Sequence, residues 1–119
     1  MMGYSRTLPT VYAVEWEHDR IIKIGYSINQ RWRNFVARGA RVVTLMEFDD
    51  KVDALVFEQR AKAGLDAFCR PAFASADQAI SRLGIGGGGW RECYRLPGDL
   101  TTREVLDQCN NEMEASNAR

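Results

Sequence analysis

The chain has 119 residues, of which 45% are hydrophobic, and this suits one domain with a single core and leaves no room for a second. Lys and Arg balance Asp and Glu at 16 each, which argues against a protein that coats nucleic acid through bulk charge. The charges are unevenly distributed, however. Six basic residues and no acidic one lie between Arg20 and Met46, whereas the tail from Asp99 onward is mainly acidic.

The cysteines and the apolar runs indicate the compartment. Cys69, Cys93 and Cys109 are odd in number and widely spaced, which favours neither a disulfide framework nor a CxxC metal site. No apolar run approaches the roughly 20 residues of a membrane span, and no basic-then-apolar leader opens the chain. We therefore expect a cytoplasmic protein without a membrane partner.

The first half of the chain predicts a hairpin, a helix and a third strand, after an irregular lead-in over residues 1–9. Two runs rich in β-branched and aromatic residues, Val11–Trp16 and Ile21–Tyr26, flank a short polar segment and predict the hairpin. Ser27 or Asn29 can cap a helix over residues 29–37. Residues 41–48 then alternate as a strand.

The second half predicts helices more clearly than strands. Asp49 or Asp50 can cap a helix over residues 52–68, and Ser75 or Asp77 a short one ending near Leu83. The glycine-rich residues 84–89 lack the lysine and Ser/Thr of a P-loop, and we expect a flexible loop. Residues 90–96 alternate like an edge strand.

A final helix and a polar tail are expected in residues 97–119, with the tail beginning at about Ala115. Thr101 can cap it, and its apolar seam consists of Val105, Leu106, Cys109 and Met113. The seam can pack on the domain formed by residues 10–96 or serve a homodimer. The sequence leaves these two uses open.

Glu58 lies where an apolar residue is expected. The inward stripe of the 52–68 helix contains Leu55, Ala61 or Lys62, and Leu65, and Glu58 has the same spacing. A buried carboxylate is costly unless a metal ion or a basic group partners it. Glu58 is therefore a candidate functional residue.

The order of these features resembles the GIY-YIG nuclease superfamily. The segments that carry the resemblance are Lys23-Ile24-Gly25, then Ser27, Asn29 and an arginine, then Ala54-Leu55 with Glu58, and finally Glu92-Cys93-Tyr94. They are similar to the short phage-type branch, in which the second motif is commonly KIG. The resemblance covers about residues 10–96. It implies an α/β (α+β) fold with a small three-stranded, mainly antiparallel sheet flanked by helices.

The resemblance also implies roles for residues. Tyr12 matches the tyrosine of the first motif, Lys23 the first position of the second motif, and Gly25 its structural glycine. Arg31 matches the catalytic arginine, with Arg33 as its competitor. Glu58 matches the metal-binding glutamate, which implies one Mg²⁺ or Mn²⁺ ion. Further DNA contacts are expected from exposed basic and aromatic residues, namely Arg33, Arg38, Arg41 and Trp90.

The sequence departs from the family pattern at several positions. Val11 and Ala13 replace the Gly-Ile neighbours of the first tyrosine, Lys62 stands where relatives often have His, and Cys93 replaces an aromatic residue. The chemistry nevertheless suits phosphodiester hydrolysis. Arg31 would bind the scissile phosphate, and Tyr12, helped by Lys23, would orient or deprotonate the attacking water.

Two functions follow as hypotheses. The first is a small metal-dependent endonuclease acting on DNA, phage-encoded and working in the host cytoplasm. The second is a catalytically silent DNA- or protein-binding module of the same fold, suggested by the missing histidine and the overall neutrality.

Overall fold

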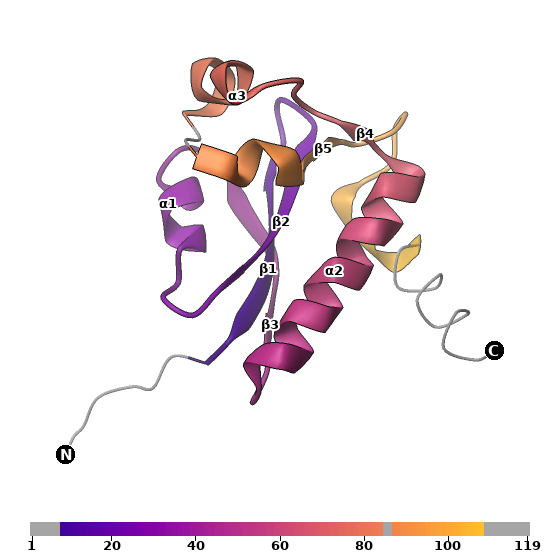
Figure 1. Cartoon of the computed structure of the whole chain (residues 1–119). Coiled ribbons are helices and arrows are strands. Elements are labelled where there is room, and N and C mark those ends of the chain that lie inside the picture. Colours follow the sequence, from indigo (N-terminus) through magenta and orange to yellow (C-terminus); the bar gives the residue numbers. More distant parts are fainter. Residues whose placement is uncertain (1–7, 85–86, 109–119) are drawn as a thin grey trace.

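The computed structural model describes residues 8–84 and 87–108, which form one antiparallel sheet with helices on both of its faces (Figure 1). The elements, in chain order, are β1 (Thr10–Trp16), β2 (Ile21–Ser27), α1 (Trp32–Val36), β3 (Arg41–Glu47), α2 (Lys51–Phe68), β4 (Arg70–Pro71), α3 (Ala76–Leu83), the 3-10 helix η1 (Gly87–Glu92) and β5 (Cys93–Arg95). Residues 102–108 are also helical.

The sheet has five strands, so the expectation of three strands was wrong. Their order is β3-β1-β2-β5-β4, and each neighbouring pair is antiparallel. The mixed α/β class and the antiparallel sheet are confirmed. β5 was expected at an edge but lies between β2 and β4, and β4 itself was not predicted. Pro71 is tolerated in β4 because an edge strand does not need every backbone N–H for pairing.

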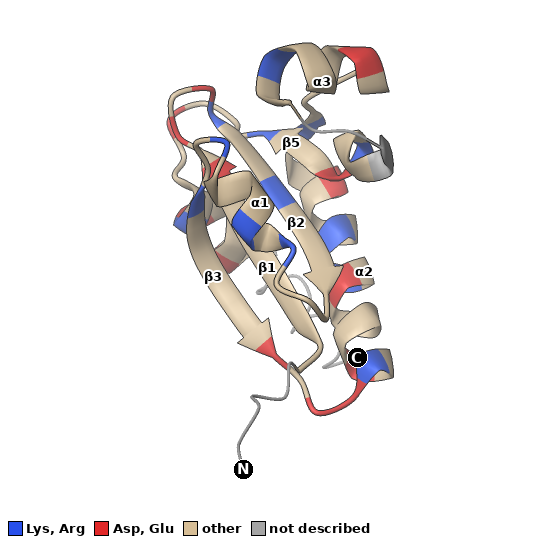
Figure 2. Cartoon of the chain, turned by 90° about the vertical axis from the view of Figure 1, so that its left-hand side faces the viewer, with Lys and Arg blue, Asp and Glu red and all other residues tan. Residues whose placement is uncertain are grey.

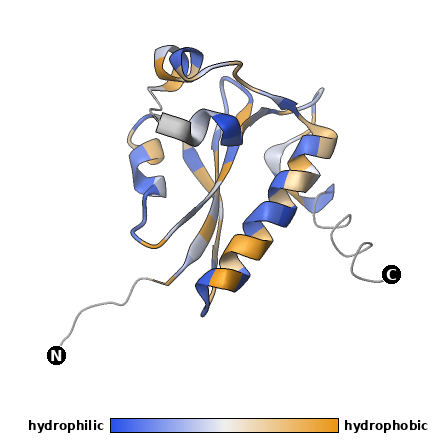
Figure 3. Cartoon of the chain, in the orientation of Figure 1, coloured by the Kyte–Doolittle hydropathy of each residue, from blue (hydrophilic) through white to orange (hydrophobic). Residues whose placement is uncertain are grey.

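The side chains of β1 and β2 alternate between two apolar cores. The core beneath α2 contains, among others, Val11, Ala13, Ile22, Ile24, Ala61 and Leu65. The core on the opposite face, beneath α1 and α3, contains Tyr12, Val14, Ile21, Phe35, Ala79 and Leu83. In Figure 3, apolar and polar segments also alternate along α2, whose apolar side lies on the sheet. β1 and β2 are therefore buried on both faces.

Three of the predicted caps are present. The Asp50 side chain accepts a hydrogen bond from the backbone N–H of Val52 at the start of α2, and Ser75 caps α3. At the final helix, the Thr101 hydroxyl accepts from the N–H of Glu104, while the Glu104 carboxylate accepts from the N–H of Thr101. This reciprocal pair is a capping box.

The helix α1 is shorter than predicted. It begins at Trp32 rather than at residue 29, because Gln30 has a left-handed backbone with φ of 58°, which a right-handed helix cannot accommodate. Asn29 is not its cap. The Ser27 hydroxyl instead accepts a hydrogen bond from the backbone N–H of Arg31, at 3.3 Å.

The glycine-rich segment also differs from the prediction. Gly87 to Gly89 are not a loop but open the helix η1, which continues through Trp90 to Glu92. The predicted strand at 90–96 is thus reduced to β5, and residues 85–86 lie outside the described part. Gly84 ends α3 with φ of 72°, a conformation that glycine adopts without strain.

The described part of the final helix packs on the same domain. Val105 is fully buried in the core beneath α2, and Leu106 packs against that core. The buried Glu15 carboxylate accepts a hydrogen bond from the Thr102 hydroxyl and so links this helix to β1. Cys109 and Met113 of the predicted seam lie outside the described residues. Within the described ranges, no helix has the length and apolar character of a membrane span.

Candidate active site

The open edge of β2 is the place where the predicted functional residues meet. β1 pairs with all of β2, from Ile21 to Ser27, whereas β5 pairs only with Ile21 to Lys23. Among the described residues, no strand covers the β5 side of residues 24–27. One side of α2 lies beside this edge, and Figure 2 shows basic and acidic segments on β2 and α2.

Lys23 is buried at this edge rather than facing solvent. Its side chain is 2% exposed, and its ammonium lies 2.7 Å from Oε1 of Glu92. The ammonium also lies 5.6 Å from the ring centroid of Tyr12 and 5.1 Å from that of Phe35, within the range of cation–π contacts. Burial lowers the pKa of Lys23, but its interactions with Tyr12 and with the Glu92 carboxylate outweigh that effect and raise the pKa above its ordinary value. Lys23 is therefore charged at neutral pH.

Tyr12 is protonated at neutral pH. The expected electrostatic effect of Lys23 is present, because the ammonium lowers the pKa of the Tyr12 hydroxyl. Burial raises that pKa more strongly, however, and the result lies above the ordinary value. The hydroxyl can thus orient a water molecule through hydrogen bonding, but it is not a phenolate at rest.

Gly25 lies opposite Tyr12 on β2 and leaves room for its ring. A Cβ atom at Gly25 would lie 2.3 Å from the Tyr12 hydroxyl oxygen and 2.5 Å from its Cζ. The ring cannot easily yield, because it stacks on Phe35 with a centroid distance of 5.9 Å. A side chain at position 25 would therefore displace Tyr12.

Gly25→Ala should destabilise the protein by about 1–3 kcal/mol, because the added methyl group overpacks this contact. The measurement is urea unfolding of Gly25→Ala and of the same substitution made in Tyr12→Ala. In the second background the clash is gone, so the glycine substitution should cost much less. Equal costs in the two backgrounds would show that Tyr12 is not what requires the glycine.

Glu58 projects from α2 to the same edge and has no close partner. It is 6% exposed, and no hydrogen bond or ion pair joins its carboxylate to another described residue. Burial and the nearby charge of Glu92 raise the pKa of Glu58, while Lys62, Lys23 and Arg31 lower it less. The predicted inward position of Glu58 is confirmed. A buried carboxylate without a partner is a place where a cation would be stabilised.

Arg31, rather than Arg33, lies within the electrostatic reach of this cluster. The positive charge of Arg31 lowers the pKa of both Tyr12 and Glu58, and the Arg31 guanidinium donates a hydrogen bond to the carbonyl of Tyr26 at 2.8 Å. Arg33 instead lies over the ring of Trp32, 5.4 Å from its centroid. Both side chains are exposed and available to a ligand.

The other residues expected to contact DNA differ in their exposure and in their position relative to the cluster. Arg38 is exposed in the turn after α1, and Trp90 on η1 is half-buried with the Arg91 guanidinium 5.1 Å from its ring centroid. Arg41 does not join this surface. It pairs with Glu15 and Glu17 near the hairpin turn, on the face of β1 opposite to Tyr12.

Sequence reasoning missed two members of the cluster, Glu92 and Lys62. The Glu92 carboxylate pairs with Lys23 through one oxygen and with Lys62, at 3.5 Å, through the other. The signal was present in the Glu92-Cys93-Tyr94 segment, but Glu92 was placed on a strand, where no partner could be named. Lys62 was named as an alternative to Ala61 in the helix stripe and as a departure from the family pattern, but not as a site residue.

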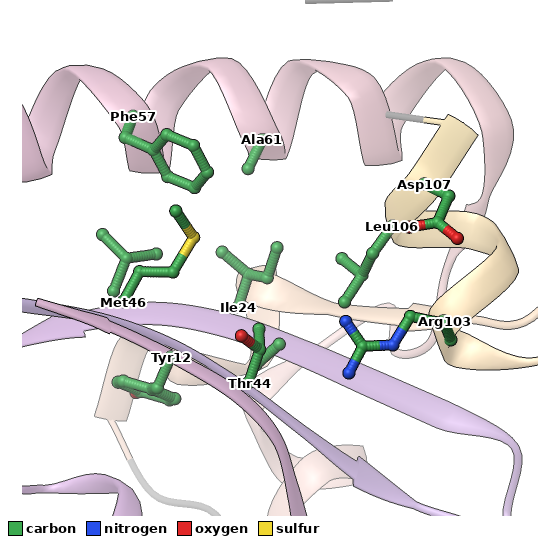
Figure 4. A pocket seen from close by; sticks show the side chains of 11 residues that line it. Tyr12, Ile24, Thr44, Met46, Phe57, Ala61, Arg103, Leu106 and Asp107 are labelled. Carbon is green, nitrogen blue, oxygen red and sulfur yellow. The ribbon is translucent and has the colours of Figure 1, made fainter. Parts of the chain in front are cut away.

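A separate cavity lies beneath α2 and does not belong to this cluster. It has a volume of about 220 Å³ and a mainly apolar lining that includes Met46, Phe57 and Leu106 (Figure 4). Arg103 and Asp107 lie at one end of it. Tyr12 borders the cavity as well, but in Figure 4 its ring lies on the side of the strands away from α2, in the opposite core. Lys23, Glu58 and Glu92 do not line the cavity.

Comparison of the chain with protein-family models, with curated proteins and with solved structures gives no match.

Proposed function

We propose that the protein is a small metal-dependent endonuclease that hydrolyses DNA phosphodiester bonds, as its resemblance to the GIY-YIG nucleases implies. One observation carries the proposal: Tyr12, Lys23, Arg31 and Glu58, which come from four separate segments, gather at one open sheet edge. Glu58 is 6% exposed there, and its carboxylate oxygens, which have no close partner among the described residues, keep some contact with solvent. We further propose that it acts in the cytoplasm, where free thiols such as Cys69 and Cys93 persist.

The side chains divide the work of hydrolysis. The Arg31 guanidinium donates hydrogen bonds to the oxygens of the scissile phosphate and balances the negative charge that develops there. The Tyr12 hydroxyl, held beside the Lys23 ammonium, orients the attacking water toward the phosphorus atom. The water oxygen bonds to phosphorus and releases a proton to solvent, while the bond from phosphorus to the leaving oxygen breaks and that oxygen takes up a proton from solvent.

Glu58 fits the role of ligand to a divalent cation. A single carboxylate with space for water and phosphate oxygens is the oxygen-rich environment that Mg²⁺ and Mn²⁺ prefer. Within the described ranges, no three His, Cys, Asp or Glu side chains are close enough to hold a metal ion together, so Glu58 would share it with water and substrate. When bound, such an ion supplies Lewis acidity toward the phosphate.

We expect the wild-type protein to nick or linearise supercoiled plasmid in the presence of Mg²⁺ or Mn²⁺, and to stop when EDTA removes the metal. Agarose gel electrophoresis of a time course measures both. The metal should be restored after chelation to show that the loss is reversible. Cleavage that continues in EDTA would contradict the metal dependence, and no cleavage under any condition would contradict the proposal.

One observation favours a second candidate, the silent binding module. The Lys23 ammonium is already paired with the Glu92 carboxylate, and burial keeps the Tyr12 hydroxyl protonated. Neither side chain is therefore in a form that can accept a proton from the attacking water. Such a module would bind DNA through the exposed Arg31 and Arg33 without needing metal. Metal-independent binding that is lost on reversing both arginine charges, together with no cleavage, would identify this alternative.

A further inference from the structure

Glu92 connects three elements of the site. It is the last residue of η1, directly before β5, and its carboxylate has both oxygens in use. Oε1 lies 2.7 Å from the ammonium of Lys23 on β2, and Oε2 lies 3.5 Å from the ammonium of Lys62 on α2. The carboxylate thus lies between the sheet and α2, at the edge where Glu58 is found.

The two lysines depend on Glu92 to different degrees. The Lys62 side chain is 25% exposed and keeps contact with water, whereas the Lys23 side chain is 2% exposed. A buried ammonium is stable only when a counter-charge replaces its water shell. Among the described residues, the carboxylate within ion-pair distance of Lys23 is that of Glu92. The position of the Lys23 ammonium is therefore set by Glu92 and by the rings of Tyr12 and Phe35.

We infer that Glu92 is a positioning residue of this site, which holds the Lys23 ammonium beside Tyr12 so that the two groups meet the attacking water in one fixed arrangement. The ion pair itself is independent of any activity, but its catalytic consequence rests on the proposed function. Glu92 need not touch the substrate, because it acts through Lys23.

The charged and titratable groups around Lys23 determine how its pKa should change when Glu92 is replaced. They are Tyr12 from β1, Glu92 from η1, Cys93 from β5, and Glu58 from α2, whose pKa is lowered by Lys23. Glu92 raises the pKa of Lys23 and that of Tyr12, whereas burial alone lowers the pKa of Lys23. Loss of the Glu92 charge should therefore lower both pKa values.

The test compares wild type with Glu92→Gln, which removes the charge at nearly constant shape, and with Glu92→Asp, which keeps it. Glu47→Gln is the control, because Glu47 is exposed at the end of β3, away from the cluster. NMR titration of the Lys23 side chain, whose signals are assigned with Lys23→Arg, measures the pKa of the ammonium and so reports on the ion pair. Plasmid cleavage kinetics measure kcat and KM, which show whether the ion pair affects catalysis.

We expect the pKa of Lys23 to fall in Glu92→Gln, to remain near the wild-type value in Glu47→Gln, and to recover in part in Glu92→Asp. In the cleavage assay, kcat should drop about tenfold or more in Glu92→Gln with little change in KM, since orientation of the reacting water is lost and not DNA binding. Recovery in Glu92→Asp would separate the charge from mere packing.

An unchanged Lys23 titration in folded Glu92→Gln overturns the inference, whatever the activity. A shifted titration with unchanged kcat overturns its catalytic part. If the wild-type protein does not cleave, the proposed function fails, and the NMR titration then decides the positioning role of Glu92 by itself.

Discussion

Glu58→Gln should reduce plasmid cleavage by about 10²-fold or more while making the folded protein more stable at neutral pH. The loss is expected because the substitution removes the carboxylate proposed to hold the divalent ion, an interaction worth several kcal/mol in such reactions. The gain in stability is expected because Glu58 is buried without a close partner, so its charge opposes folding. Cleavage rates and thermal melting measure the two effects.

The pH dependence of the stability gain follows from the raised pKa of Glu58. The folded state holds the Glu58 proton more tightly than the unfolded chain does, so the wild type loses stability as pH rises through this titration. At acid pH, wild type and Glu58→Gln both carry a neutral side chain, and their melting temperatures should converge. At neutral pH, the variant should melt higher. A lower melting temperature for the variant at neutral pH would mean that the Glu58 carboxylate stabilises the fold.

A matched control keeps this experiment specific. Glu17→Gln removes a carboxylate whose side chain is 76% exposed and which lies near Arg41, at the hairpin turn. Its cleavage rate should match the wild type. If folded Glu58→Gln cleaved as well as the control, Glu58 would not be part of the active site.

Arg31→Ala should lower the cleavage rate by about 10²–10³-fold, because it removes the donor proposed for the scissile phosphate. Arg33→Ala, two residues further along and in the first turn of α1, should lower it only slightly. The physical reason is position: Arg31 influences both Tyr12 and Glu58, whereas Arg33 rests on Trp32. Single-turnover cleavage at saturating enzyme separates this effect from weaker binding.

The Arg31 side chain also makes a structural contact, so Arg31→Ala alone could lower activity by disturbing the fold. It donates to the carbonyl of Tyr26, so Arg31→Lys is needed to keep a positive charge while the two-pronged geometry is lost. We expect Arg31→Lys to remain well below wild type. If Arg33→Ala were the more damaging variant, Arg33 would be the catalytic arginine of the site.

The local elements were predictable because their signals are local. The hairpin of β1 and β2 was indicated by two β-rich runs around a polar turn, and it is present with the expected pairing. Asp50, Ser75 and Thr101 cap helices through hydrogen bonds to residues two or three positions ahead. The inward position of Glu58 followed from helical spacing alone.

Local patterns therefore sufficed to predict β1, β2, β3, α2 and α3, and a carboxylate on the inward side of α2. The pairing of segments far apart in the chain depends on contacts made only in the folded protein. β4 and β5 are short strands that exist through pairing with each other and with β2, and no local pattern of two or three residues specifies such contacts. The same pairing stops at Lys23, which leaves the sheet edge open. It also brings Glu92, more than sixty residues along the chain, to the Lys23 ammonium, so the composition of the site could be read only from the folded chain.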